Sequence, residues 1–87
     1  MSLKNLEAAM MLLSAKATEH YAAIELIVNQ PVAISEHIDH VGEIVRRAKL
    51  LAECEEAYTS LRQHFVEAPA AAAAEEARLK APENEDD

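Results

Sequence analysis

Three of the four histidines could carry chemistry, because a helical hairpin would bring them close to a carboxylate. His37 and His40 stand three residues apart, and Glu43 follows three residues after His40. If the chain folds back near Pro31, His20 comes opposite residue 43, within about one helical turn of His40 and Glu43. Imidazole and carboxylate groups on helices can bind zinc or a similar ion. The candidate metal ligands are therefore His20, His37, His40 and Glu43.

A structural role explains these histidines more simply. The Glu-x-x-His signature of di-iron bundles is absent, and so is His-Glu-x-x-His. His20 falls in an apolar seam, where a polar layer fixes helix register, whereas His37 and His40 suit the solvated edge of a helix. We therefore expect no metal and no cofactor. The alternative is a metal- or pH-responsive bundle, since charging an imidazole within a seam costs desolvation.

The other reactive groups do not indicate an enzyme. Gly42 is the only glycine, so no glycine-rich phosphate loop is present. Cys54 is expected in an apolar seam with no histidine placed to activate it, and a helical hairpin has no deep pocket. A single cysteine cannot form an internal disulfide and is typical of a reducing, cytoplasmic setting. The sequence predicts a non-enzymatic cytoplasmic protein.

The charge pattern disfavours nucleic acids and membranes as partners. The net charge is −8 and the sequence pI is about 4.9, whereas both partners require a basic face. Arg46, Arg47 and Lys49 form the only basic cluster, but they do not share one helical stripe and glutamates surround them. No apolar run reaches the roughly 20 residues of a membrane span.

A long helix over about residues 3–29 must position these groups. Its seam residues are separated alternately by three and four positions, which is the heptad pattern of a helix packed against near-parallel or antiparallel neighbours. They are Leu3, Leu6, Met10, Leu13, Ala17, His20, Ile24 and Ile27. Tyr21 and Val28 widen this face, which favours a bundle over an isolated helix pair.

A second long helix is predicted over about residues 33–67, after a turn at 29–34 containing Pro31, with Pro31 or Ser35 near its start. Its predicted apolar stripe comprises Ile34, Ile38, Val41, Ile44, Val45, Ala48, Leu51, Cys54, Tyr58, Leu61 and Phe65. The three-residue steps from Val45 to Cys54 resemble a stammer. Gly42 is expected inside this helix, at a close helix approach or a bend. An antiparallel hairpin then pairs residues whose numbers sum to about 63, for example Met10 with Cys54.

The chain beyond residue 67 changes in character. Residues 68–87 hold an alanine run between Pro69 and Pro82 and end in an acidic stretch. Alanine favours helix, but a segment of about a dozen residues is too short to be stable alone in water. We predict a hairpin domain at 1–67, followed at 68–87 by a frayed alanine-rich helix and an acidic, disordered tail.

These patterns together predict an all-α protein: an antiparallel helical hairpin that pairs with a second copy into a four-helix bundle, a coiled-coil-like homodimer. The expected function is a protein–protein interaction module that acts as an adaptor, an assembly factor or an inhibitor of a larger protein. The predicted interface comprises Leu6, Met10, Leu13, Ala17, Tyr21, Ile24 and Ile27, with Met11, Leu12 and Leu26 left over for a partner. The second alternative is a subunit of a hetero-complex that folds only with its partner.

Overall fold

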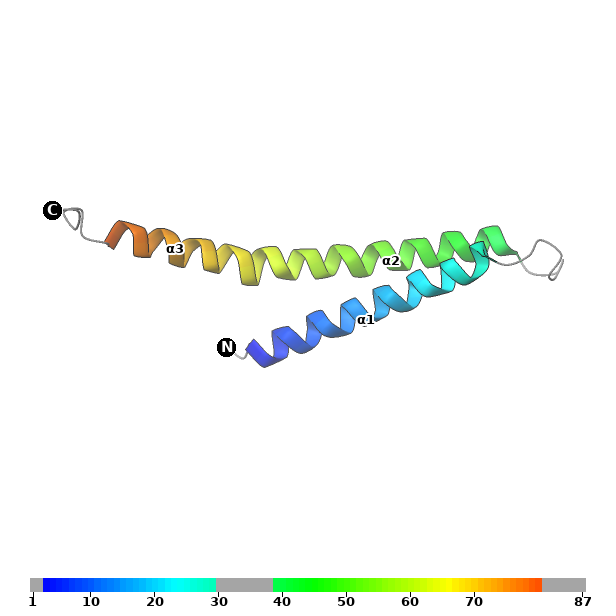
Figure 1. The fold of residues 1–87 in the computed structure, drawn as a ribbon, viewed down its shortest axis with the longest axis horizontal. Helices are drawn as coiled ribbons and strands as arrows, with labels where there is room; N and C mark the ends of the chain where they lie inside the picture. Colours follow the sequence, from blue (N-terminus) through cyan, green and yellow to red (C-terminus); the bar gives the residue numbers. More distant parts are fainter. Residues whose placement is uncertain (1–2, 30–38, 81–87) are drawn as a thin grey trace.

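The structure, a computed structural model, describes residues 3–29 and 39–80. It contains α1 (Leu3–Val28), α2 (His40–Arg62), the π-helical turn η1 (Gln63–Glu67) and α3 (Ala68–Lys80) (Figure 1). The described residues form no strand. The prediction of an all-α protein with two long helices joined by a turn is confirmed.

The two long helices form one open layer. They lie together at the turn end of the hairpin and splay apart toward the N-terminus of α1, while α3 extends beyond that terminus (Figure 1). Among the described elements, α1 contacts only α2, and α3 contacts only η1. The molecule measures 76 × 29 × 14 Å. A thickness of 14 Å is little more than one helix diameter of about 10–12 Å, so no second layer covers the first.

The seam predicted for α1 is confirmed almost completely. Its half-buried side chains are Leu6, Met10, Leu13, Ala17, His20, Ala23, Ile24 and Ile27. Only Leu3 departs from the prediction, because it is 71% exposed where the helices splay apart. None of the described residues is fully buried. The hairpin has a contact seam but no core of its own.

The stripe predicted for the second helix is wrong in part. Val41, Val45 and Ala48 are exposed, and Arg47 takes the inward position there instead. Phe65, at the C-terminal end of the predicted stripe, is 50% exposed. The half-buried residues of α2 are His40, Glu43, Ile44, Arg47, Leu50, Leu51, Cys54, Ala57, Tyr58 and Leu61. The central seam among them consists of His40, Ile44, Arg47, Leu51, Cys54, Tyr58 and Leu61. Their steps alternate regularly between four and three, so no stammer is present. The long aliphatic stem of Arg47 fills the seam while its charged end reaches the edge, which hydrophobic patterning alone does not reveal.

α2 begins at His40, later than the predicted start near residue 33. Asp39 caps it, since its carboxylate accepts a hydrogen bond of 2.9 Å from the backbone N–H of Gly42. A Cβ on Gly42 would lie 2.9 Å from the carboxyl carbon of Asp39, so the glycine leaves room for the cap. The expectation that Gly42 marks a bend or a close helix approach is therefore wrong. Pro31, Ser35 and all but the first residue of the predicted turn at 29–34 lie outside the described residues, as does the acidic end of the chain.

The long helix continues past residue 67 through a widened turn. The N–H of Ala68 donates to the carbonyl of Gln63, five residues back, and Pro69 follows directly. Because proline has no N–H and crowds the preceding turn, an ordinary α-helix is disfavoured there, and the π turn accommodates the ring. Arg62 and Glu67 are also five residues apart and form an ion pair of 3.0 Å across this turn. The predicted alanine-rich helix is present as α3, joined to α2 without a break.

Candidate interaction surface

The open layer carries two adjoining grooves between α1 and the long helix. The first has a volume of about 730 Å³ and is lined by Leu3, Lys4, Leu6, Glu7, Met10, Met11, Ser14, Ala15, Tyr58 and Val66. The second has a volume of about 390 Å³ and is lined by Leu13, Ser14, Ala17, Thr18, Cys54, Glu55, Tyr58 and Thr59. Ser14 and Tyr58 line both, so the grooves follow one face of the layer.

The lining of the grooves suits apolar side chains better than catalysis. The larger groove is walled mainly by the aliphatic and thioether side chains of α1. In the smaller groove, the Thr18 hydroxyl already donates 3.0 Å to the backbone carbonyl of Ser14 within α1. Cys54 lines this groove as a half-buried free thiol. A helix from another chain could place its side chains along such a face.

The predicted interface residues divide into two sets in the structure. Leu6, Met10, Leu13, Ala17, Ile24 and Ile27 are half-buried against α2, whereas Met11, Leu12, Tyr21 and Leu26 are exposed. Of the exposed set, only Met11 lines a groove. Sequence reasoning missed several lining residues, among them Ser14 and Val66. Ser14 follows Met10 by one helical turn, and this spacing could have identified it. The position of Val66 depends on the π turn, which the sequence did not predict.

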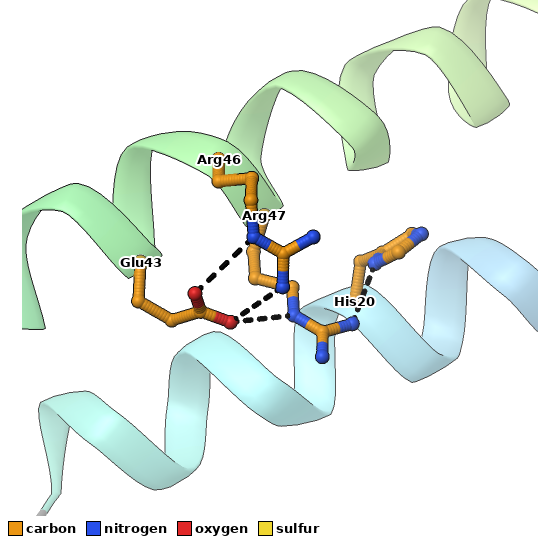
Figure 2. Close-up of polar contacts among 4 residues, drawn as sticks. All are labelled: His20, Glu43, Arg46 and Arg47. Carbon is orange, nitrogen blue, oxygen red and sulfur yellow. Dashed lines mark hydrogen bonds and ion pairs between the residues drawn. The ribbon is translucent and has the colours of Figure 1, made fainter.

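One polar network joins the helices near the turn end of the hairpin (Figure 2). Glu43 accepts two hydrogen bonds from Arg46, at 2.7 and 3.2 Å, and one from the Nε of Arg47, at 3.1 Å. Nη1 of Arg47 lies 3.0 Å from Nδ1 of His20 on α1. Because a guanidinium only donates, Nδ1 of His20 is the acceptor in this contact.

This arrangement determines the electrostatics of the network. Hydrogen bonds from Arg46, and then from Arg47, hold the pKa of the Glu43 carboxyl below its ordinary value. Glu43 in turn raises the pKa of Arg46. Both arginines of the basic cluster are therefore engaged by a carboxylate, which leaves this cluster less suited to phosphate.

The candidate metal ligands are not assembled into a site. His20 faces Arg47, and Nδ1 of His40 is buried without a hydrogen-bond partner. Within residues 3–29 and 39–80, no three histidine, cysteine, aspartate or glutamate side chains group in a way that could hold a metal ion. His37 lies outside the described residues.

The contact between His20 and Arg47 also corrects the predicted register. The two residue numbers sum to 67, whereas the prediction of 63 placed residue 43 opposite His20. Leu13 accordingly lines one groove with Cys54, about one helical turn beyond residue 50, which a sum of 63 would place opposite it. The error arose because the turn was centred on Pro31, whereas the described helices end at Val28 and resume at His40.

Comparison with known proteins adds no relative. No family model matches the sequence, and no curated protein or solved structure matches the chain. None of the helices described has the length and apolar character that a membrane span requires.

Proposed function

We propose that this protein is a non-enzymatic protein–protein interaction module: a helical hairpin that self-associates into a four-helix bundle and serves as an adaptor, an assembly factor or an inhibitor of a larger protein. One observation carries the proposal. Two long helices present matching heptad seams, yet none of the described residues is fully buried. A second layer packed on the groove face would supply the missing core.

The exposed surface area of the chain is large enough to support association. The chain exposes 7124 Å². A compact monomer of 9.6 kDa is expected to expose about 5100 Å², so the excess is about 2000 Å². A stable interface of standard size buries about 800 Å² on each partner. The excess, which includes the exposed surface of α3, is larger than the area that a dimer of standard size buries on each partner.

The exposed residues Leu12 and Leu26 line neither groove. They are candidates for contact with a target protein after self-association. A hetero-complex in which a different chain covers the groove face makes a different prediction, because the isolated protein would then be monomeric and poorly folded.

The first test is the solution mass by light scattering, with far-UV circular dichroism on the same sample. We expect a highly helical dimer or a higher oligomer of even number. A helical monomer over the whole accessible concentration range would contradict self-association. A largely unfolded monomer would favour the hetero-complex.

A charge placed within the seam gives the second test. Leu13→Asp puts a carboxylate between α1 and α2 at the smaller groove, so it should dissociate or unfold the assembly. Leu12→Asp is the matched control, because Leu12 is the neighbouring residue, is exposed and lines neither groove. If Leu13→Asp leaves both mass and helicity unchanged, the proposed core is incorrect.

A further inference from the structure

We infer that the occupant of the larger groove is α1 of a second copy, lying antiparallel to the first and inserting its Tyr21 beside Met10. This inference rests on the proposed self-association and specifies its geometry. It differs from self-association alone because two hairpins could also meet through α2, or with their first helices parallel.

One edge of α1 borders the larger groove along its N-terminal half. Leu3, Glu7, Met10 and Ser14 line the larger groove and are separated by four, three and four positions. The same spacing continues through Ala17, Tyr21, Ile24 and Val28. Residues with this spacing follow one edge of a helix. The N-terminal half of this edge is therefore hollowed by the groove.

The C-terminal half of the same edge projects large side chains. Tyr21 is 58% exposed and Val28 is 63% exposed, although both are apolar or aromatic. Neither lines a groove in the single chain. One edge thus carries a recess at one end and projecting groups at the other, which is the requirement for a self-complementary, two-fold symmetric contact.

Antiparallel pairing brings the two halves into register. When two copies of this edge run in opposite directions, residues whose numbers sum to 31 come opposite each other. Tyr21 then meets Met10, Val28 meets Leu3, and Ala17 meets Ser14. Small residues lie at the symmetry axis, where the helices approach most closely, and each tyrosine enters the partner's groove.

The chemistry of the edge favours a second copy. Glu7 is the only charged residue of this edge; it is exposed in the single chain and comes opposite Ile24 of the second copy, near the outer end of the contact. A buried tyrosine typically contributes about 150–250 Å² of contact area, and two-fold symmetry uses this contribution twice. Pairing through this edge leaves α2 free to contact the partner's α2, which completes four helices.

Cross-linking at two positions tests the geometry. In a Cys54→Ala background, Ser14→Cys places two thiols about 4.5 Å apart along the helix axis, since three residues separate the position from its symmetry mate. Val28→Cys places them about 38 Å apart along the axis, since 25 residues separate them. A short bismaleimide should therefore link Ser14→Cys dimers efficiently and leave Val28→Cys unlinked.

The other outcomes overturn the inference in distinguishable ways. Linking at both positions would indicate parallel first helices, and linking at neither would place α1 away from the interface. The mass of each variant is measured first. A monomer would count against the proposed self-association itself, whereas a dimer with the wrong cross-links would count against this geometry alone.

A substitution at the projecting residue gives an independent test. Tyr21→Glu should weaken dimerisation at least tenfold, because it removes an interface aromatic and adds a charge in the partner's groove. Leu26→Glu is the matched control, since Leu26 is also exposed on α1 and lines neither groove. Circular dichroism at high protein concentration should show both variants helical. Equal dimer dissociation constants for the two variants would overturn the inference.

Discussion

The contact between His20 and Arg47 should contribute measurably to the pairing of α1 with α2. The two side chains form a hydrogen bond of 3.0 Å between the helices, and the Arg47 side chain is only 25% exposed. A hydrogen bond to a charged group contributes about 1.5–3 kcal/mol when buried. Partial exposure of Arg47 reduces this value, so we expect a coupling free energy of about 1 kcal/mol.

A double-mutant cycle measures this coupling directly. His20→Ala, Arg47→Ala and the double variant are unfolded in urea at one fixed protein concentration, because association links stability to concentration. Each single variant should lose more stability than the coupling alone, since both side chains also pack in the seam. The double variant should be less destabilised than the sum of the two by about 1 kcal/mol.

The size of the coupling decides whether the hydrogen bond contributes to stability. A coupling below about 0.3 kcal/mol, within the usual limit of additivity, would refute the role assigned to this contact.

Three further predictions concern the long helix. Asp39→Ala should lower the free energy of unfolding in urea by about 1 kcal/mol. Gly42→Ala should be nearly neutral alone but stabilising by about 1 kcal/mol once the Asp39 cap is removed. Additive effects of the two substitutions would show that the glycine does not serve the cap. The pKa of Glu43 is lowered on folding, so its contribution to stability is present above the ordinary glutamate range and is lost as the pH falls through the lowered value. Glu43→Gln should therefore reduce the loss of stability at acid pH, measured as the free energy of unfolding against pH. An unchanged loss at acid pH would contradict this assignment. Pro69→Ala should increase the protection of backbone amides from hydrogen exchange over residues 63–72. The free energy of unfolding should change little, because α3 contacts neither α1 nor α2. Equal protection in the variant and the unsubstituted protein would show that the proline does not cause the π turn.

Much of the architecture could be predicted from residue types and spacing. The bounds of α1 and seven of its eight seam positions follow from an unbroken heptad pattern. A continuous apolar face on a helix determines which side of that helix is covered. The alanine-rich composition after residue 67 likewise indicated the helix that the structure shows as α3. These are local properties, and each depends on a few neighbouring residues.

The tertiary structure decided what depends on contacts between distant residues. Val45 and Ala48 looked like seam residues because they are apolar, yet Arg47 lies inward because its stem packs on α1 and its charge meets His20 and Glu43. The inward position of Arg47 also sets the register between α1 and α2. The grooves depend on the register as well, since Tyr58 and Val66 line the larger groove opposite α1 only in this register and with a widened turn before Pro69. Periodicity identifies which face of a helix is covered, but a long amphipathic side chain can enter that face only when its partner is in place.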